Sequence, residues 1–237
     1  MAARIERVTF SGSHGDDLAA RLDLPAGPAR AFAMFAHCFT CSKDIAAASR
    51  IANALTDVGF GVLRFDFTGL GMSDGEFENT NFTSNTDDLV AAADWLRSVH
   101  RAPQLLVGHS LGGSAVLAVA ADIPEVRAVA TIGAPASPDH VTGVFAESLD
   151  EIESEGVASV QLAGRPFTIR QQLIDDLRGH VIIDRVRTMK RPLLVLHSPI
   201  DNTVSVDHAA EIFGAARHPK SFVSLDGADH LLTDRND

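Results

Sequence analysis

The chain of 237 residues predicts an α/β fold, a mostly parallel central sheet with helices on both faces. Three short apolar runs, at 31–37, 103–107 and 192–197, are typical of strands covered on both faces. Segments with helical spacing of apolar residues, such as 44–58 and 83–99, separate such strands. This alternation favours a sheet whose parallel strands are joined by crossover helices.

The remaining elements follow in chain order. Residues 4–11 and 17–24 predict an antiparallel pair of strands at the start of the chain. Residues 62–65 and 221–225 predict two further strands. No internal repeat or low-complexity linker divides the chain, so we expect a single domain over residues 1–237.

Ser110 lies at the apex of the sequence GHSLG (108–112), between an apolar strand and a helix of small residues. A G-x-S-x-G turn at such a junction is strained, and the strain exposes the serine Oγ for attack on a carbonyl carbon. Glycines flank the serine because a Cβ at either position would clash at so sharp a turn. The amide of Leu111, at the helix N-terminus, would face the developing oxyanion. The sequence therefore predicts Ser110 as a nucleophile.

An aspartate and a histidine follow the serine, each after a predicted strand. Asp201 follows the run 192–197, and His230 follows the run 221–225. Because the carboxyl ends of parallel strands meet at one edge of a sheet, we expect these side chains to lie beside Ser110. The order serine, acid, histidine is that of alpha/beta hydrolases. His230 would take the serine proton, and Asp201 would orient His230 and stabilise its imidazolium.

Three other aspartates compete for the role of the acid. Asp226 and Asp229 lie so close to His230 in the sequence that we expect them to shape its loop instead. Asp66 follows a strand but precedes Ser110, which is out of order, and is expected to hold its own glycine-rich loop.

Segments over nearly the whole chain resemble the hydrolase half of bifunctional alpha/beta-hydrolase/OsmC proteins. The resemblance implies an alpha/beta-hydrolase fold. In that family an OsmC-type, thiol-peroxidase-like domain follows the hydrolase. Because this chain stops shortly after His230, we expect no OsmC domain in it. The segments that carry the resemblance are HCFTCSKD (37–44), LRFDFTGLG (63–71), TIGAP (131–135), AGRPF (163–167), HPKSF (218–222) and ADHLL (228–232).

The resemblance to alpha/beta hydrolases also implies where the second amide of the oxyanion hole lies. Many of these enzymes carry His-Gly-X after an early strand and use the amide of X. By position that residue is Phe39, and Leu111 supplies the other amide. Cys38 stands where the glycine is usual, so both Cys38 and Phe39 stay candidates for the donor. His37 is expected to fix this loop rather than to act as a base.

Cys38 and Cys41 form a C-x-x-C pair and are the only cysteines in the chain. Zinc would need two more ligands of suitable spacing, so we expect no metal. A redox-active pair stays open, because a nearby helix N-terminus lowers the pKa of a thiol. We favour two reduced, partly buried thiols that line the site, with Cys38 contacting the substrate.

The alternation of strand and helix breaks down between about 137 and 187. Helical pieces around 141–155 and a possible hairpin over 157–169 fill this insert. Inserts at this point of the alpha/beta-hydrolase fold usually form a lid, and we expect a small lid insert here. Its apolar side chains either line the substrate pocket or pack the lid onto the core, and both interpretations stay open. These side chains are Val144, Phe145, Leu162 and Phe167.

Composition narrows the function classes. A net charge of −11, with no basic stripe, argues against nucleic acid as a partner. The first residues lack a signal-peptide pattern, and no apolar run approaches the length of a membrane span, so we expect no membrane partner. Two cysteines in a chain of this length favour a cytoplasmic location.

Together these features predict a serine esterase that cleaves carboxylic esters of small to medium acyl chain through an acyl-enzyme. Its partner is a small-molecule ester, and no metal or organic cofactor is implied. A thioesterase or a carbon–carbon bond hydrolase with the same triad is the alternative, and a non-catalytic binding module of the same fold is the alternative of another class.

The residues after His230 predict one more property. Alpha/beta hydrolases usually place a further helix there, but only seven residues, LLTDRND, remain. We therefore expect an uncovered apolar face beside the last strand and a homo-oligomer that buries it.

Overall fold

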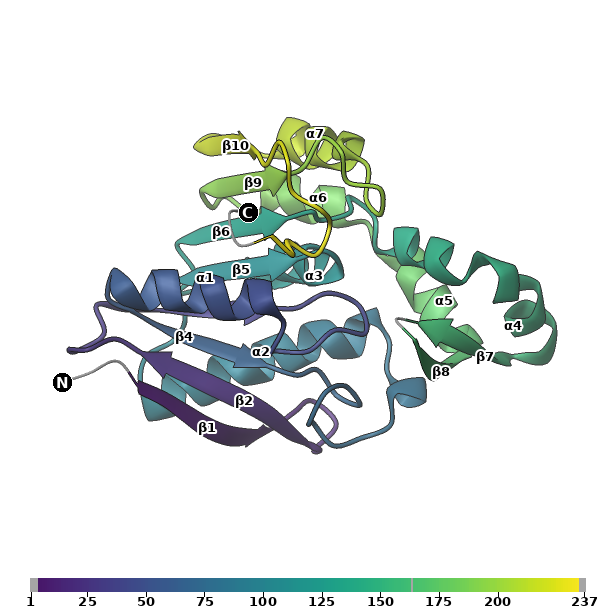
Figure 1. Ribbon diagram of the computed structural model, residues 1–237, viewed down its shortest axis with the longest axis horizontal. Coiled ribbons are helices and arrows are strands. Elements are labelled where there is room, and N and C mark those ends of the chain that lie inside the picture. The colour runs from purple at the N-terminus through teal and green to yellow at the C-terminus, as the bar shows by residue number, and fades with distance from the viewer. Residues whose placement is uncertain (1–3, 163, 235–237) are drawn as a thin grey trace.

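The computed structural model describes residues 4–162 and 164–234. β1 pairs antiparallel with β2, and β2 antiparallel with β4, whereas the remaining neighbours pair in parallel. The predicted α/β fold with a mostly parallel sheet is therefore confirmed (Figure 1). The eight strands of the sheet lie in the order β1 (Arg4–Ser11), β2 (Asp17–Leu24), β4 (Phe60–Phe65), β3 (Ala31–Ala36), β5 (Leu105–His109), β6 (Ala128–Ile132), β9 (Leu193–His197) and β10 (Lys220–Ser224).

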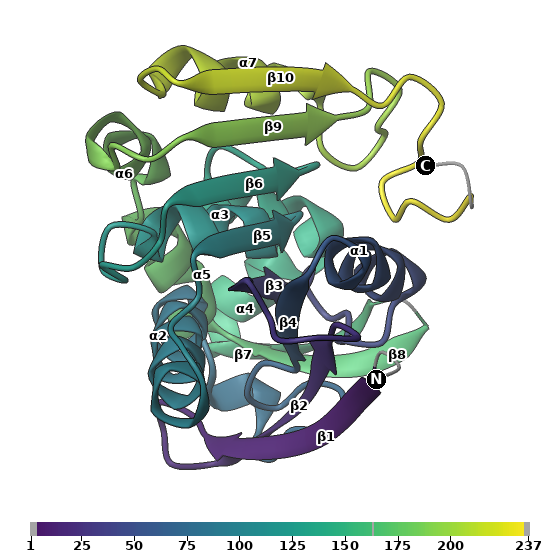
Figure 2. The ribbon, with the colours of Figure 1, turned by 90° about the vertical axis from the view of Figure 1, so that its left-hand side faces the viewer.

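Helices cover both faces of this sheet (Figure 2). α1 (Ala46–Asp57) lies on one face. A capping box between Asn81 and Ser84 starts α2, and the Ser205 side chain caps the first turn of α7. The other face carries α2 (Phe82–Val99), α3 (Leu111–Val119), α6 (Ile182–Thr188) and α7 (Val206–Ala215).

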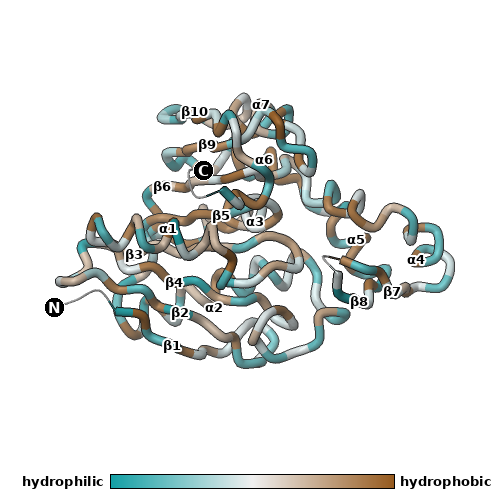
Figure 3. Tube along the Cα trace, viewed as in Figure 1, coloured by the Kyte–Doolittle hydropathy of each residue, from teal (hydrophilic) through white to brown (hydrophobic). Residues whose placement is uncertain are grey.

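The middle strands form the core of the molecule. Every residue of β3 is buried, as the uninterrupted apolar sequence predicts for a strand covered on both faces. Figure 3 shows hydrophobic colour along β3 and β5, near the centre of the sheet. Their carboxyl ends all point to the same edge, where the loops that carry the candidate site begin.

The insert forms a cap at this edge of the sheet, to the right of the sheet in Figure 1. α6 packs against α3 and α7, so the last part of the insert expected over 137–187 covers the sheet instead of the site. The cap elements are η2 (Pro138–Ser148), α4 (Leu149–Glu155), the hairpin β7 (Val157–Leu162) and β8 (Arg165–Arg170), and α5 (Gln171–Gly179). The short helix η1 (Phe77–Asn79) contacts β8 from the body.

One part of the sheet is open on the α1 face. A cavity of about 590 Å³ lies there, lined by apolar side chains of α1, β5, β6 and β9 and by Lys220 and Ser221 at the start of β10. The edge strand β10 exposes Phe222 and Val223. Residues 225–234, which follow β10, return toward α1, and the Arg50 guanidinium donates to the Leu232 and Asp234 carbonyls. An uncovered apolar face was expected here, and self-association through it stays a prediction that light scattering would test.

None of the helices in the described part of the chain is long and apolar enough to cross a membrane.

Candidate active site

The turn between β5 and α3 carries Ser110. Its backbone has φ 54° and ψ −126°, a region that residues other than glycine rarely adopt. The Ser110 amide donates to the carbonyl of Ile132 in β6 at 2.8 Å, which anchors the turn. A Cβ at Gly112 would lie 2.4 Å from the carbonyl oxygens of Ala36 and His37, so only glycine fits there. The local sequence thus determines a strained backbone at the nucleophile position.

The structure brings Ser110, His230 and Asp201 into one hydrogen-bonded chain. The Ser110 hydroxyl donates to His230 Nε2 at 2.9 Å, and His230 Nδ1–H donates to Asp201 Oδ2 at 2.7 Å. Asp201 Oδ1 accepts from the amides of Thr203 and Val204 at 2.8 and 2.9 Å. Burial raises the pKa of Asp201, but the hydrogen bonds from His230, Val204 and Thr203 outweigh it and hold this pKa below its ordinary value. Asp201 is therefore ionised and oriented at neutral pH.

The competing aspartates have structural partners. The Asp229 carboxylate accepts from the amide of Thr233 at 2.9 Å and from its hydroxyl, and Asp226 accepts from the Ser224 hydroxyl. Both carboxylates shape the loop that carries His230.

Asp66 joins two loops: the oxyanion loop (residues 37–44), which follows β3, and its own glycine-rich loop (residues 66–71). It is fully buried and accepts from the amide and Nζ of Lys43 at 2.6 and 2.5 Å. It also accepts from the amide of Met72 at 2.9 Å, which ties down the glycine-rich loop as expected.

The oxyanion loop follows β3 and lies beside Ser110. The amide of Cys41 donates to the carbonyl of Cys38 at 3.1 Å, and Thr40 between them has φ 58°, which is rare for a β-branched residue. Among the described residues, no protein acceptor is found for the amides of Phe39 and Leu111. The carbonyl of Cys38 is turned toward the His37 ring, which fixes the direction of the Phe39 amide in the same peptide. The amide of Cys38 also has no protein acceptor among the described residues, so both amides stay candidates for the second donor.

Cys38 and Cys41 form a disulfide, and the preference for two reduced thiols is wrong. The tight turn brings their Cα atoms to 5.3 Å, within the range that a disulfide spans. The disulfide also removes the reason for expecting a reducing compartment, and the compartment of the protein stays a prediction.

A cavity of about 210 Å³ opens over Ser110 and His230. Three of the expected substrate-binding residues, Cys38, Val144 and Leu162, line it. The other two do not: Phe145 is buried against the Phe39 ring, and Phe167 packs on Phe77, with ring centroids 6.4 and 5.0 Å apart. Their rings join the cap to the body. This agrees with the second interpretation of these side chains, in which they pack the lid onto the core.

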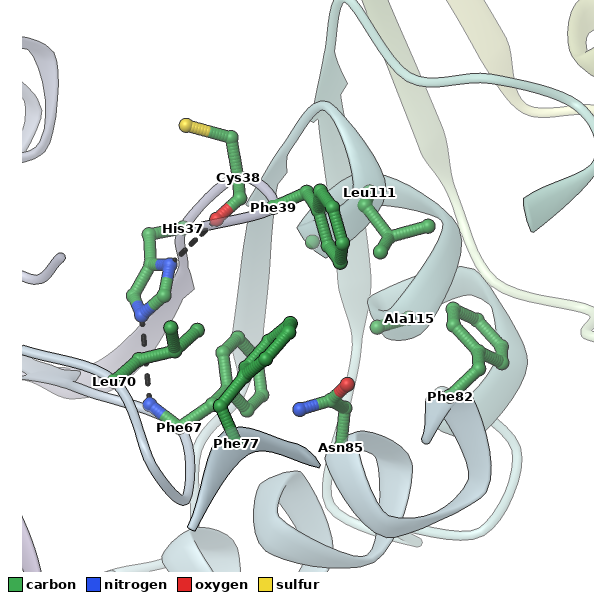
Figure 4. Close-up of a pocket in the computed structure, with 11 residues that line it drawn as sticks. His37, Cys38, Phe39, Phe67, Leu70, Phe77, Phe82, Asn85, Leu111 and Ala115 are labelled. Carbon is green, nitrogen blue, oxygen red and sulfur yellow. Dashed lines mark hydrogen bonds between the residues drawn. The ribbon is translucent and has the colours of Figure 1, made fainter. Parts of the chain in front are cut away.

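A second, smaller cavity of about 20 Å³ lies behind the oxyanion loop (Figure 4). The side chains of Phe39 and Leu111 separate it from the Ser110 cavity, since both residues line each of the two. Asn85 from α2 points its amide into this space among phenylalanine rings.

Two positions beside the site were not recognised in the sequence. The Arg165 guanidinium, from the cap hairpin, donates to the Thr40 carbonyl at 2.8 Å and so connects the cap with the oxyanion loop. A Cβ at Gly133, where φ is 56°, would lie 3.3 Å from Asp201 Oδ2 and 3.4 Å from His230 Nδ1. A glycine directly after a predicted strand was the available signal for the second position, whereas nothing local marks the first.

Within the described ranges, no group of three or more His, Cys, Asp or Glu side chains is arranged to hold a metal ion.

Comparison with models of protein families shows which family the chain belongs to. The family model "Serine aminopeptidase, S33" matches residues 27–165. The chain belongs to this family of alpha/beta hydrolases. The esterase domain of a Rhodothermus marinus protein is 50% identical, with a TM-score of 0.78, over 98% of this chain and 92% of that one.

More distant members of the superfamily agree in fold. A ferulic-acid complex of Est1E from Butyrivibrio proteoclasticus superposes with a TM-score of 0.79 at 19% identity, over 96% of this chain and 93% of that one. The human "Palmitoyl-protein thioesterase ABHD10, mitochondrial" is 29% identical over 154 residues, which are 62% of this chain and 49% of that protein. The chain thus spans about half the length of the curated relatives that it matches first.

Proposed function

We propose that this alpha/beta hydrolase cleaves carboxylic esters of small to medium acyl chain through an acyl-enzyme intermediate. The observation that carries the proposal is the continuous chain of hydrogen bonds from Asp201 through His230 to Ser110 at the base of an apolar cavity. Ser110 Oγ attacks the ester carbonyl while His230 Nε2 takes its proton. The amides of Phe39 and Leu111 stabilise the oxyanion, and each such donor contributes roughly 3 kcal/mol.

The same side chains complete the turnover. Protonated His230 gives its proton to the departing alkoxide, which leaves as an alcohol, and Ser110 stays acylated. Water then attacks the acyl-enzyme with His230 again as the base, and the acid is released. Asp201 accepts from Nδ1–H throughout and stabilises the imidazolium that forms in each step.

The cavity lining favours an uncharged acyl group. Among the described residues that line it, none is an aspartate, a glutamate, a lysine or an arginine. An aminopeptidase would need a carboxylate to pair with the substrate ammonium, so the activity in the family's name is not the one that we propose here. A volume of about 210 Å³ lies below the range of roughly 300–1,000 Å³ that is typical of sites for drug-sized ligands, which favours short acyl groups.

A thioesterase with the same triad is the second candidate. The observation that favours it is the similarity to a palmitoyl-protein thioesterase. Both reactions form the same acyl-enzyme, so the leaving group is what distinguishes them. A carbon–carbon bond hydrolase and a non-catalytic binding module are the further alternatives, and the second of these would leave Ser110 unreactive.

We also keep the resemblance to the hydrolase half of OsmC-fused proteins, and a cytoplasmic location, as proposals. The segments of the sequence that carry the resemblance support the first. The second stays a proposal without support from the disulfide between Cys38 and Cys41.

A fluorophosphonate probe and a panel of substrates test the proposed function. The unchanged protein should label at one site, and Ser110→Ala should abolish labelling and lower kcat by several orders of magnitude without loss of folding. The kcat/KM values for nitrophenyl esters from acetyl to dodecanoyl, each compared with the matching thioester, then show which leaving group and which acyl length the protein prefers. Absence of labelling would favour the binding module, and higher kcat/KM for every thioester would favour the thioesterase.

A further inference from the structure

Three buried histidines lie directly beneath the candidate site. His109 and His197 are the last residues of β5 and β9, and His37 directly follows β3. Each is at most 1% exposed, and none of them contacts the Ser110 Oγ. They lie at the carboxyl ends of three parallel strands of the sheet, and each ring points to a different loop.

Each ring is hydrogen-bonded to one backbone carbonyl, and each carbonyl lies in a loop that carries a catalytic group. His37 Nδ1 lies 2.8 Å from the Cys38 carbonyl in the oxyanion loop. His109 Nε2 lies 2.6 Å from the carbonyl of His230 itself. His197 Nε2 lies 2.8 Å from the Val204 carbonyl in the loop that carries Asp201.

Because a carbonyl only accepts, the ring nitrogen facing it must carry the proton. The Nδ1 atoms of His109 and His197 are buried and have no hydrogen-bond partner among the described residues, so a proton there would have no acceptor. In His37 the other nitrogen, Nε2, accepts from the amide of Phe67 at 3.4 Å. Each ring is therefore oriented with one donor nitrogen toward its carbonyl. Burial, reinforced by the neighbouring His230, lowers the pKa of His109 to about 4, which keeps this ring a single donor at neutral pH.

The bond from His37 sets the direction of an oxyanion donor. The Cys38 carbonyl and the Phe39 N–H belong to one planar trans peptide and therefore point in opposite directions. Figure 4 shows the Cys38 carbonyl turned toward the His37 ring. Holding this carbonyl aims the Phe39 N–H away from His37.

The other two bonds act on the acid and the base. His109 holds the carbonyl of His230, a residue outside regular secondary structure, and the two rings lie 5.2 Å apart. His197 holds the carbonyl of Val204, and the amide of the same residue donates to Asp201 Oδ1. A shift of either carbonyl would change the two distances that join Asp201, His230 and Ser110.

We propose that His37, His109 and His197 are positioning residues that hold the oxyanion, base and acid loops in register with Ser110. This inference rests on the proposed hydrolase function. It requires one N–H donor at each position, and an aromatic ring of similar size without that donor does not suffice.

Paired substitutions separate the donor from the ring. A glutamine amide nitrogen corresponds in reach to Nε2, and an asparagine amide nitrogen to Nδ1. His109→Phe and His197→Phe keep the volume and lose the donor, whereas His109→Gln and His197→Gln keep a donor at the required distance. The Phe variants should lower kcat by about 10- to 100-fold with KM unchanged, because small misplacements of catalytic groups have effects of this size. The Gln variants should recover most of that loss.

His37 calls for a readout of its own. His37→Phe should weaken binding of a boronic acid, which mimics the tetrahedral intermediate, more than binding of the product carboxylate, and His37→Asn should restore it. His180→Phe is the matched control, since His180 bonds Thr83 and packs on Phe82 away from the three loops.

The outcomes distinguish the inference from the proposed function. If the unchanged protein does not label with a fluorophosphonate, the proposed function is wrong. If it labels, folded Phe variants with parental kcat overturn the inference, as do Gln variants that lose as much kcat as the Phe variants. Where His109→Phe or His197→Phe does not fold, the Asn variant at the same position replaces it, because an asparagine amide is too short for the carbonyl that Nε2 reaches. Activity equal to that of the corresponding Gln variant then overturns the inference.

Discussion

The sheet side and the cap side of the Ser110 cavity are built differently. On the sheet side, hydrogen bonds of defined direction hold the Asp201 carboxylate and the carbonyls of the loops that carry the catalytic groups. On the cap side, the walls are apolar side chains such as Val144 and Leu162, and the ion pair between Arg170 and Glu78 that ties cap to body is exposed.

This difference indicates a division of labour. A hydrogen bond fixes the position of an atom, whereas apolar contact excludes water and sets a size with little dependence on direction. We therefore expect changes of one or two atoms on the sheet side to alter the rate of chemistry. Changes on the cap side should alter which substrates fit.

The largest effect is expected at the acid. Asp201→Asn should lower kcat by about 10⁴-fold, because an amide no longer enforces the His230 tautomer that accepts the Ser110 proton. Steady-state kinetics on a nitrophenyl ester measures this. Asp229→Asn and Asp226→Asn are the controls and should have much smaller effects, since these carboxylates accept from Thr233 and Ser224. A ranking with Asp229 first would contradict the assignment of Asp201.

The next effect concerns stability in acid. The pKa of His109 is lowered from 6.5 to about 4 in the folded protein, so below pH 6.5 the unfolded chain takes a proton that the folded chain refuses. Stability is therefore lost as the pH falls from 6.5 toward 4, by about 2 kcal/mol between pH 7 and pH 5 for this one group. Urea unfolding at the two pH values measures the loss.

His109→Gln should remove that share of the pH dependence, because glutamine does not titrate. The cap residue His180, changed to Gln, is the control and should leave it in place. Identical pH dependence in His109→Gln and the unchanged protein would show that the buried ring is not the cause.

A smaller effect is expected where the two sides meet. Arg165→Met keeps an unbranched apolar stem and loses the guanidinium donor to Thr40, next to the oxyanion donor Phe39. A hydrogen bond to a charged group contributes roughly 1.5–3 kcal/mol, and partial exposure reduces this, so we expect about a tenfold loss of kcat. Arg170→Met is the matched control, because its exposed ion pair lies away from the oxyanion loop. Equal losses in both variants would mean that the cap acts through its overall position alone.

The sequence predicted the sheet side better than the cap side. Ser110, Asp201 and His230 each follow a strand, and the apolar runs, the glycine-flanked turn and the order along the chain are all local signals. The bonds from His109 and His197 to loop carbonyls have no such signal, because the sequence around a histidine at a strand end does not show which loop its ring contacts. Tertiary packing alone decides that partner.

The wrong prediction for the two cysteines and the open one for the two phenylalanines have physical reasons too. The spacing of Cys38 and Cys41 permits a disulfide but does not require one, and forming it needs Thr40 at a positive φ that its β-branched side chain disfavours. The sequence leaves open whether Phe145 and Phe167 line the cavity or pack the cap onto the body, because both are apolar and lie in the cap. The direction of each ring depends on contacts with Phe39 and Phe77, which come from distant parts of the chain.

The smallest expected effect is a change in acyl-chain preference. Leu162, on the cap hairpin, lines the Ser110 cavity, so Leu162→Ala enlarges the space for the acyl group. Burial of one added methylene contributes roughly 0.8 kcal/mol, or about fourfold in kcat/KM. The unchanged protein should prefer short to medium acyl groups. In Leu162→Ala, kcat/KM for hexanoyl and octanoyl esters should rise several-fold relative to the acetyl ester, while kcat for the acetyl ester stays close to parental.

Phe167→Leu, which alters the cap outside the cavity lining, is the control and should keep the parental ranking. An unchanged protein that hydrolyses dodecanoyl esters more efficiently than acetyl and butanoyl esters would contradict the size limit. A Leu162→Ala variant that loses activity on all esters alike would show that the cap, like the sheet side, takes part in the chemistry.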